Sequence, residues 1–563
     1  MKNTEYMYVD GIPVAINGEK NMLQVIRKTG VKLPTFCYHT DLSIYGACRM
    51  CMVEDERGNL YTACSTPPRD GMSIKTNTAR LRKYRKNILE LLLANHCRDC
   101  TTCANNKSCK LQDLAVRFNI EGVRFPNRAD DNKVTNSSAS IVFDSGKCIL
   151  CGDCVRTCHE VQNVGAIDFA FRGSKMLIST AFGKPLSETM CVGCGQCAVA
   201  CPTGAITARS EIQKVWDAIS DSSVKTVVQV APAVRVALGN MVGIPEGKDV
   251  SGLIFAALRK MGFDEVFDTS FGADITVLEE SKEFLERLKE GKRLPIITSC
   301  CPAWIQYCEK KHPELMENVS TCRSPMEMFA SVIKEERQER GKKLFHVAVM
   351  PCTAKKFEAQ REEFLGKDGS RNVDAVITTD ELTHMLKEAG ILLNEIDPEP
   401  VDHPYDNASG AAVIFGVTGG VTEAVLRNVV KDKSRSALMK LSNVGERGNE
   451  GLKIFELTTE DGVGLRIGVA SGLANAEKLL GMLKNGEKFD IIEIMACPGG
   501  CVAGGGQPFV HAEVRKTRGK GLYDTDRMLS IRHSESNASV QALYDRLLKG
   551  REHELLHVHY KKK

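Results

Sequence analysis

The stretch CPGGCVAGGGQP (497–508) decides how the C-terminal half of this chain is organised. It begins with Cys497 and contains Cys501 four residues later. It follows the apolar segment 489–495, whose pattern is typical of a buried strand. Two earlier apolar segments also run into cysteines: 294–298 precedes Cys300 and Cys301, and 346–350 precedes Cys352. In open α/β sheets, ligands bind beyond the carboxyl ends of the strands. The three strand ends therefore predict one shared iron–sulfur site.

Three consecutive glycines, 504–506, follow Cys501. A backbone without Cβ atoms can approach a bulky cofactor closely. We therefore expect the glycine run to pack against the iron–sulfur site.

The segments TSCCPAW (298–304), MPCTAKKFE (350–358) and EIMACPGGCVAGGGQP (493–508) closely resemble the signatures of iron–iron hydrogenases. FGADITVLEE (271–280) and FGVTGGVTEA (415–424) extend the resemblance. It implies reversible H₂ oxidation and proton reduction at an H-cluster, which is a 4Fe–4S cubane joined to a two-iron unit with CO, cyanide and a dithiolate. The implied ligands are Cys301, Cys352, Cys497 and Cys501, with Cys501 shared by the two parts.

Length and charge set broad limits on the function. At 563 residues the chain is expected to form several domains. Its 75 basic and 71 acidic residues nearly balance, and no block of like charge suggests nucleic-acid binding. The start lacks an apolar signal core, and no run reaches the length of a membrane span. We expect a cytoplasmic protein, although export together with a signal-bearing partner stays open.

The 23 cysteines are the dominant feature of the composition. A disulfide framework fits poorly, because the chain is long and its cysteines fall in short-range clusters. Zinc is the next alternative, since Cys-x2-Cys pairs also bind zinc. Triplets of cysteines with a remote fourth favour iron–sulfur clusters instead.

Residues 1–78 are predicted to form the first domain. Segments 7–9 and 12–16 alternate like a hairpin around Asp10-Gly11, and a helix is expected to begin at Met22. Cysteines follow at Cys37, Cys48, Cys51 and Cys64. The pattern, and GACRMCMV (46–53) above all, resembles the 2Fe–2S β-grasp ferredoxin domain of complex I large subunits and multi-cluster hydrogenases. The first gap is longer than in plant-type ferredoxins.

Residues 79–125 are predicted to form a second domain with a helix over 81–94. The pattern that follows resembles a site in the same proteins where one histidine and three cysteines bind a 4Fe–4S cluster. Its ligands would be His96, Cys100, Cys103 and Cys109. A lone histidine is usually structural, although imidazole also binds iron. Cys97 is left over and is predicted to be a small buried thiol.

Residues 126–208 contain two near-repeats of Cys-x2-Cys-x2-Cys-x3-Cys. This is the run of bacterial 2×4Fe–4S ferredoxins, in which the fourth cysteine of each set binds the other cluster. One cluster would be held by Cys148, Cys151, Cys154 and Cys201. The other would be held by Cys191, Cys194, Cys197 and Cys158. His159 replaces the usual proline after the first run, so we expect a local difference in the turn.

From residue 209 the pattern changes to alternating apolar strands and charged helices, beginning with a strand over 224–230. The fold class predicted for the whole chain is multidomain α+β and α/β. Residues 209–515 resemble the two-lobed α/β domain that holds the H-cluster. Residues 516–563, with GLYDTDR (521–527) and LLHVHY (555–560), resemble the small subunit of the family fused to the main chain.

Glu280, Glu283 and Arg287 recur at the spacing of one helical face. On spacing alone such a face is most often solvated, and Cys300 is most often an inert thiol. The resemblance implies a proton path instead, through Cys300, Glu280, Ser320, Glu283 and Arg287. Proton transfer by positioned groups with tuned pKa values is the general mechanism.

The resemblance also implies contacts to the two-iron unit. Lys355 would hydrogen-bond a cyanide ligand, since an ammonium offers three donors. The backbone at Ala231-Pro232 would meet the other cyanide, and Met350 and Met495 would pack around the irons. Ordinary core packing explains both methionines equally well. Met326 stands where many relatives have glutamine, which weakens the case for a side-chain contact to the cofactor from this position.

Three other functions compete with hydrogen turnover. An iron–sulfur assembly protein of the hydrogenase-like type would lack the full relay and an intact second signature. An H₂ sensor would carry an added sensory module or an altered relay. An electron-transfer subunit of a complex I-like dehydrogenase would explain only residues 1–208. We therefore favour a hydrogenase, with three accessory 4Fe–4S clusters and one 2Fe–2S cluster beside the H-cluster.

The implied partners are ferredoxin, a flavin-containing NAD(P)H-oxidising subunit, or both, together with maturation proteins. No convincing nucleotide-binding glycine fingerprint occurs in the chain, so any NAD(P) chemistry is expected in another subunit. Cys97, Cys308 and Cys322 are predicted to be dispensable for iron binding.

Overall fold

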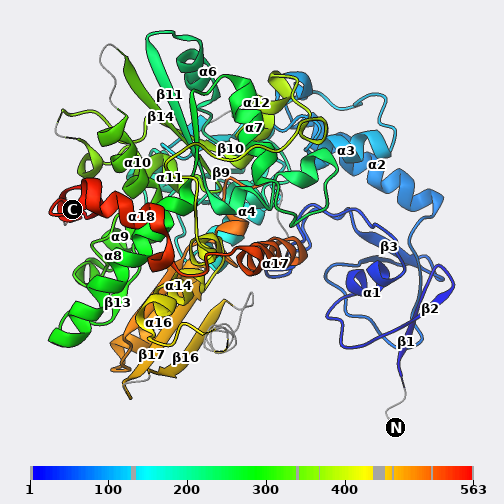
Figure 1. The fold of residues 1–563 in the computed structure, drawn as a ribbon. Coiled ribbons are helices and arrows are strands. Elements are labelled where there is room, and N and C mark those ends of the chain that lie inside the picture. Colours follow the sequence, from blue (N-terminus) through cyan, green and yellow to red (C-terminus); the bar gives the residue numbers. More distant parts are fainter. Residues whose placement is uncertain are drawn as a thin grey trace.

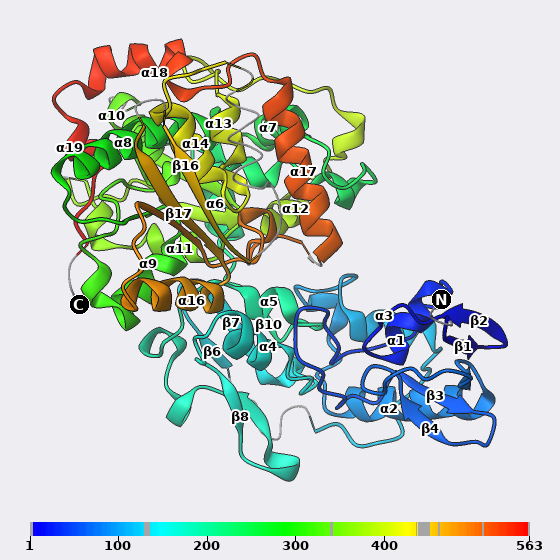
Figure 2. The same cartoon turned by 90° about the horizontal axis from the view of Figure 1, so that it is seen from below.

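A computed structural model describes residues 4–128, 135–337, 342–366, 368–434, 436, 451–459, 462–508 and 512–560. In Figures 1 and 2 the N-terminal segments (blue) lie to one side of a larger body formed by the rest of the chain. The ferredoxin-like segment (cyan) lies between them in Figure 2. No helix of the described part is both long and apolar enough to cross a membrane.

The N-terminal sheet has the strand order β2-β1-β5-β3-β4. Its elements are β1 (Tyr6–Val9), β2 (Ile12–Ala15), α1 (Met22–Lys28), β3 (Met52–Asp55), β4 (Leu60–Thr62) and β5 (Ser73–Lys75). The predicted hairpin is confirmed: Asp10 and Gly11 both have positive φ, as its two-residue turn requires. The predicted helix is also confirmed, and the Asn21 side chain caps it by accepting from the N–H of Gln24.

The next segment is helical, as predicted. Helix α2 (Ala79–Ala94) begins where the Thr78 hydroxyl accepts from the N–H of Leu81, and it ends just before His96. Helix α3 (Lys110–Arg117) follows Cys109 directly. Leu89 of α2 and both Leu111 and Leu114 of α3 share one buried cluster.

The ferredoxin-like part contains the sheet β10-β7-β6 and the hairpin β8-β9. Its main elements are β6 (Thr135–Ser137), β7 (Ile141–Asp144), α4 (Asp153–Arg156), β8 (Asp168–Ala170), β9 (Leu177–Ser179), α5 (Gln196–Ala200) and β10 (Ile206–Ala208). Helices α4 and α5 each follow a glycine with positive φ, Gly152 and Gly195. These glycines turn each cysteine loop into its helix without a Cβ clash.

The first sheet of the C-terminal body has the order β12-β11-β14-β15, and all its pairs are parallel. Its elements are β11 (Val224–Val230), β12 (Glu265–Asp268), β14 (Lys343–Met350) and β15 (Ala375–Thr378), with helices α6 (Ile212–Ser220), α7 (Ser251–Met261), α10 (Pro325–Glu336) and α12 (Thr379–Glu388). The predicted strands at 224–230 and 346–350 are confirmed.

The second sheet has the order β13-β18-β17-β16 and is parallel except for the pair β16-β17. Its elements are β13 (Ile296–Ile297), β16 (Leu452–Thr458), β17 (Gly464–Ser471) and β18 (Ile491–Met495), with helices α9 (Pro302–Lys311), α14 (Gly420–Val429) and α16 (Leu473–Lys484). The long helix α8 (Thr269–Glu290) joins the two lobes: Phe271 packs in a core with the first sheet, and Phe284 packs in a core with the second.

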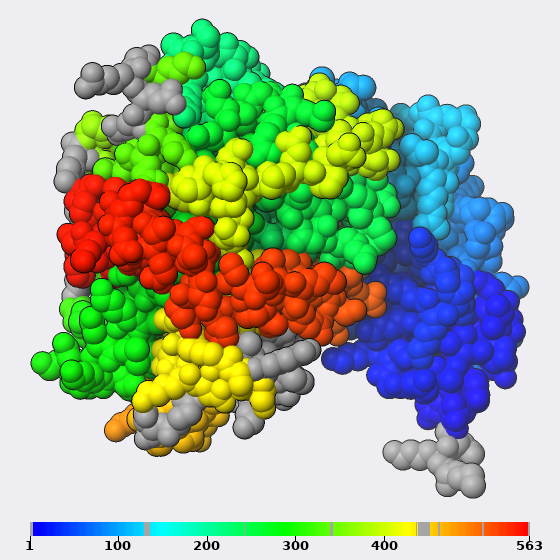
Figure 3. All heavy atoms as spheres, in the orientation of Figure 1, coloured from blue at the N-terminus to red at the C-terminus, as the bar shows by residue number. Residues whose placement is uncertain are grey.

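The C-terminal segment runs over the outside of this body, where Figure 3 shows it in orange and red. It contains α17 (Ala512–Met528), α18 (Ala538–Leu543) and α19 (Glu552–Leu556). The predicted boundary between residues 515 and 516 falls inside α17. Beyond α19 the chain forms a bridge between His557 and Cys322, which brings the tail to the edge of the α8 core.

Candidate active site

One cavity collects the ends of four strands from both lobes. Its empty volume is about 820 Å³, and apolar atoms form most of its wall. Strand β11 delivers Ala231 and Pro232, β14 delivers Met350 and Cys352, β13 delivers Cys300 and Cys301, and β18 delivers Met495, Cys497 and Cys501. Residues far apart in the sequence therefore line one space, as the strand-end rule predicts.

The four cysteines at 301, 352, 497 and 501 are close enough for their charges to interact. Burial raises the pKa of the Cys497 thiol, and the thiols of Cys352, Cys301 and Cys501 raise it further. Such a group of buried thiols stays protonated in the protein alone. Cationic iron would offset the charge of four thiolates, and four cysteines are the usual donors of a cubane. The donor set therefore fits an iron–sulfur cluster.

The glycine run has a different role from the one predicted. A Cβ on Gly504 would lie 2.0 Å from the carbonyl oxygen of Pro351, and a Cβ on Gly505 would lie 2.3 Å from that of Cys194. A Cβ on Gly506 would clash with the Thr378 side chain. Of the three glycines, only Gly504 lines the cavity. The expectation of cofactor packing is therefore wrong for Gly505 and Gly506, which instead allow neighbouring segments of the protein to approach closely.

This close approach joins the ferredoxin-like part to the cavity. Cys194 itself lines the cavity. The Thr353 hydroxyl donates to the carbonyl of Gly193 at 2.7 Å, and the Gln196 amide donates to the carbonyl of Ala503 at 2.9 Å. A cluster bound by Cys194 would thus be the nearest electron donor to the cavity.

Lys355 lines the cavity from helix α11 (Ala354–Glu358). Its Nζ donates to Glu358 Oε2 at 2.6 Å and to the carbonyl of Cys300 at 3.4 Å. Burial opposes the charge on this ammonium, but the Glu358 carboxylate outweighs it and raises the pKa of Lys355. A charged, buried donor is therefore held at the cavity wall.

The residues of the predicted proton path also come together. Burial raises the pKa of Glu280 to about 8, and the neighbouring Glu283 carboxylate adds to the effect. Burial likewise raises the pKa of the Cys300 thiol, with Glu280 as its most influential charged neighbour. The Ser320 hydroxyl donates a hydrogen bond of 2.9 Å to Glu283 Oε2. Its hydrogen bond to Glu280 partly offsets the rise in the pKa of that group. The helical face of α8 that carries these groups is buried, so it is not a solvated face.

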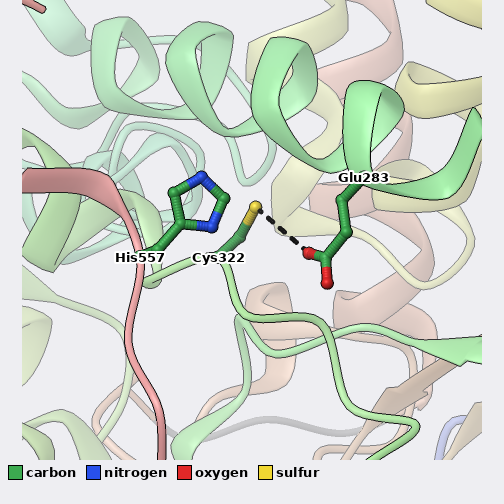
Figure 4. A group of neighbouring side chains, drawn as sticks. All are labelled: Glu283, Cys322 and His557. Carbon is green, nitrogen blue, oxygen red and sulfur yellow. Dashed lines mark hydrogen bonds between the residues drawn. The ribbon is translucent and has the colours of Figure 1, made fainter. Parts of the chain in front are cut away.

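Arg287 closes the far end of this series and is itself buried. It donates to Glu283 Oε1 at 2.5 Å and to the carbonyls of Arg293, Asn318 and Val319. Figure 4 shows Cys322 and His557 beside Glu283, with Cys322 Sγ at 3.9 Å from the carboxylate. Cys322 thus belongs to the surroundings of the glutamates and not to a cysteine cluster.

The first cysteine set lies in the N-terminal sheet domain. The backbone N–H of Cys48 donates to Cys37 Sγ at 3.3 Å, and the N–H of Phe36 donates to Cys48 Sγ at 3.4 Å. The thiols of Cys51 and Cys64 are hydrogen-bonded neighbours. Both Cys37 and Cys48 also raise the pKa of Cys64 electrostatically. Four thiols with backbone donors aimed at sulfur fit a 2Fe–2S site.

His96 lines a second cavity together with Cys100 and Cys109. Its Nε2 atom is buried and has no hydrogen-bond partner within the described residues. Burial lowers the pKa of this imidazole, which keeps it in the neutral form that binds metals. Cys103 is an electrostatic neighbour of both Cys100 and Cys109. This group fits a cluster with one histidine ligand.

The two ferredoxin-type runs exchange their fourth cysteines. Burial raises the pKa of Cys151, and Cys201 and Cys148 are among its charged neighbours. Burial also raises the pKa of Cys194, with Cys191 and Cys158 beside it. The grouping of Cys201 with the first run and of Cys158 with the second is the one expected for two crossed cubane sites.

Three features of the site were not predicted. Glu358, the partner of Lys355, lies three residues later on the same helix, and this spacing is a signal for an ion pair. Phe415 and Gly416 line the cavity, although their segment was noted only for its resemblance. Glu327, which is fully buried near Glu358, carried no signal of function.

Comparison with family models divides the chain into five matched regions. The model "Iron only hydrogenase large subunit, C-terminal domain" matches residues 224–505, and "Iron hydrogenase small subunit" matches 512–563. The N-terminal part matches a 2Fe-2S iron-sulfur cluster binding domain (6–79), an NADH-ubiquinone oxidoreductase-G iron-sulfur binding region (85–124) and a 4Fe-4S dicluster domain (147–205).

Relatives match over nearly the full length. NADP-reducing hydrogenase subunit HndD of Solidesulfovibrio fructosivorans is 40% identical over 99% of this chain and 98% of its own. Iron hydrogenase 1 of Clostridium pasteurianum is 34% identical over 98% of this chain and 99% of its own. A solved structure of the FeFe-hydrogenase HydA1 from Chlamydomonas reinhardtii superposes with a TM-score of 0.54 at 37% identity, covering 62% of this chain and 99% of that one.

A relative with a different name matches a smaller part. Cytosolic iron-sulfur assembly component 3 of Mus musculus is 32% identical over 66% of this chain and 82% of its own.

Proposed function

This chain belongs to the iron-only hydrogenase family and interconverts H₂ with protons and electrons, and from that premise we propose how its residues do so. We propose that Cys301, Cys352, Cys497 and Cys501 hold an H-cluster in the central cavity. The observation that supports this is the convergence of these four thiols with Cys300 and Lys355 on one space. When bound, the cofactor supplies the iron at which H₂ is split or formed.

The protein residues position and protect that chemistry. Lys355 offers its remaining N–H donor to an anionic ligand of the cofactor, while Glu358 fixes its side chain. Met350 and Met495 form apolar wall, and the backbone at Ala231 and Pro232 closes the cavity from the first lobe. These apolar surfaces exclude water, which strengthens the remaining polar contacts.

Protons move along the buried face of α8. The Cys300 thiol would hold a proton at the cavity wall and would be resupplied by Glu280, which is protonated at neutral pH because its pKa is about 8. Ser320 links Glu280 to Glu283. Arg287 acts by holding Glu283 in place, since a guanidinium does not release its proton near neutral pH.

Electrons travel through four accessory clusters. We assign one 2Fe–2S cluster to Cys37, Cys48, Cys51 and Cys64. One 4Fe–4S cluster is assigned to His96, Cys100, Cys103 and Cys109, a second to Cys148, Cys151, Cys154 and Cys201, and a third to Cys191, Cys194, Cys197 and Cys158. The last of these adjoins the cavity through Cys194. The matching domains are 1–78 (β-grasp), 79–125, 126–208, 209–515 (two-lobed) and 516–563, and the last boundary lies within helix α17.

The electron partner is proposed to be an NAD(P)H-oxidising, flavin-containing subunit, with ferredoxin as a second acceptor. The full-length similarity to an NADP-reducing hydrogenase subunit and the match to an oxidoreductase-G region support this choice. We propose a cytoplasmic location, where maturation proteins supply the cofactor. Hydrogen turnover is favoured over iron–sulfur assembly because Cys300, Cys352 and Lys355, which an assembly protein of this type is expected to lack in part, all line the cavity.

The test is purification of the matured protein from its host without oxygen. We expect H₂-dependent reduction of NADP⁺ when flavin-containing subunits copurify, and reduction of an artificial dye by the isolated chain. An isolated chain that carries its full iron complement but neither evolves nor consumes H₂ would contradict the proposal.

A further inference from the structure

Two buried glutamates near Lys355 influence each other electrostatically, and neither belongs to the proposed proton path. Glu327 is on the first turn of α10, and Glu358 is the last residue of α11. Their exposed fractions are 0% and 1%. Glu358 bonds Lys355, while Glu327 accepts only a weak hydrogen bond of 3.4 Å from the Asn372 amide. Two carboxyl groups are therefore buried with a single close cationic partner.

Each carboxyl group has one oxygen without a partner. Glu327 Oε1 and Glu358 Oε1 are both buried, and within the described residues neither makes a hydrogen bond. Buried polar atoms are nearly always bonded, so two such atoms on neighbouring side chains need an explanation. A proton on one carboxyl group provides it, because a neutral carboxyl group is far less costly to bury than an ionised one.

The surrounding charges do not neutralise a second carboxylate. Arg323 and Lys355 face Glu327, but Lys355 is held by Glu358 and Arg323 donates to the carbonyls of His557 and Glu554. Farther out, Tyr560 packs under Arg361, which is paired with Glu309. Burial raises the pKa of Glu327 to about 8, and the Glu358 carboxylate contributes next. Two buried carboxyl groups that influence each other in this way cannot both ionise easily.

We propose that Glu327 and Glu358 form a second proton-binding site, in which Glu327 holds one proton at neutral pH. Neither the family models nor the names of the relatives assign such a site. Glu358 is the ionised member, since it neutralises Lys355. The site lies on the Lys355 side of the cavity, whereas Glu280 reaches the cavity through Cys300.

Ionisation of Glu327 would add one negative charge behind Lys355. Its effect on the cavity rests on the proposed function, because Lys355 must face the cofactor there. A negative charge stabilises the oxidised form of a nearby cluster, so the reduction potential of the cubane in the cavity should fall as the pH rises through about 8.

The first test detects the protonated carboxyl group directly by infrared pH-difference spectroscopy. It uses anaerobic full-length protein that contains its iron–sulfur clusters but lacks the two-iron unit. All samples carry E280Q, because Glu280 also titrates near pH 8. Burial raises the pKa of Asp153 to about 7 as well, so the band of Glu327 is identified as the one that the E327Q substitution removes. A carboxylic acid band that disappears as the pH is raised through 8 is expected in this background. E327Q should remove the band, and the control E335Q, at an exposed glutamate paired with Arg551, should keep it.

E358Q provides a second variant at the same site. Without the Glu358 carboxylate, Glu327 would pair with Lys355 and ionise, so the band should again be absent at neutral pH. The proposal would be overturned if E327Q or E358Q removed no acid band from the spectrum of the E280Q parent. This outcome is independent of hydrogen turnover, so a hydrogenase without the band would refute the proton site and leave the proposed function intact.

The second test follows the consequence for the cavity. Redox titration of the same protein, monitored by the spin signal of the reduced cubane, should show a potential that falls between pH 7 and pH 9. E327Q should flatten this dependence, and E335Q should retain it. An equal slope in E327Q and the parent would refute the link between the site and the cavity.

Discussion

Arg287 donates a hydrogen bond of 2.5 Å to Glu283 while only 1% of its own side chain is exposed. Its other N–H groups meet three backbone carbonyls, so the guanidinium is anchored on several sides. The proton path implied by the resemblance includes this residue. The contacts of Arg287 hold the Glu283 carboxylate in position.

Replacement of Arg287 by methionine should therefore act on stability and activity together. Leaving Glu283 buried without its cation is expected to cost about 3–5 kcal/mol of unfolding free energy. Hydrogen production should fall because Glu283 loses the hydrogen bond that holds it in position. Thermal unfolding and dye-linked activity measure the two effects. The matched control R551M breaks an exposed pair with Glu335 and should cost about 1 kcal/mol or less. Equal losses in both variants would contradict this role.

Replacement of Cys300 by serine should leave the cofactor in place but reduce turnover by about 10²-fold or more, the usual contribution of a positioned proton donor. A hydroxyl is a far weaker acid than the thiol. Iron content and hydrogen production check the two parts. The control C308S alters a buried cysteine on α9 that does not line the cavity and should keep near-normal turnover. Near-full activity in C300S would refute the proton role.

Glu280 should set an upper pH limit for hydrogen production. Its pKa of about 8 means that it holds a proton at pH 7 and loses it above pH 8. The rate should then fall about tenfold per pH unit above 8, because the protonated fraction falls in that proportion. E280Q should be slow at every pH, and the control E286Q, on the exposed side of α8, should keep the wild-type profile. A wild-type profile that stays flat to pH 9.5 would contradict the assignment.

The same shift has a consequence for stability. The pKa of Glu280 is raised from 4.5 to about 8 in the folded protein, so folding binds its proton more tightly. Its contribution is present at low pH and is lost as the pH rises from about 4.5 through 8. Urea unfolding of the E280Q protein should show a weaker decline over this window.

Gly505 should be sensitive to the addition of one methyl group. A Cβ there would lie 2.3 Å from the carbonyl oxygen of Cys194, so G505A forces the cluster loop away from the catalytic domain. We expect the free energy of unfolding to fall by about 1–3 kcal/mol. Electron transfer from the accessory clusters to the cofactor in the cavity should also become slower. G481A is the control, because no atom lies within 4 Å of a Cβ added at Gly481. Unchanged electron transfer in a folded G505A protein would contradict the proposed electron entry.

The fold was predictable wherever local patterns agree with tertiary contacts. The strands that end at Met350 and Met495 were evident from apolar runs, and the strand-end rule correctly brought their cysteines to one cavity. The glycine run was misinterpreted because sequence shows that a close approach is needed but not which group approaches. In the structure that group is the backbone of Pro351 and Cys194 for the first two glycines.

Glu327 shows a second limit of the sequence. Ser324 and Glu327 have the spacing of a helix capping box, in which the glutamate would turn back to the helix start. The Ser324 hydroxyl does accept from the N–H of Glu327, but the carboxylate lies near Asn372 and Glu358 instead. Local spacing could not reveal this, because Asn372 and Glu358 reach the site from other elements.

The central claim is that Cys301, Cys352, Cys497 and Cys501 hold an H-cluster, and infrared spectroscopy of anaerobically matured protein tests it most directly. We predict stretching bands of iron-bound CO and cyanide in the wild type and their loss in C501S. Matured protein with its full iron content and no such bands would contradict the account.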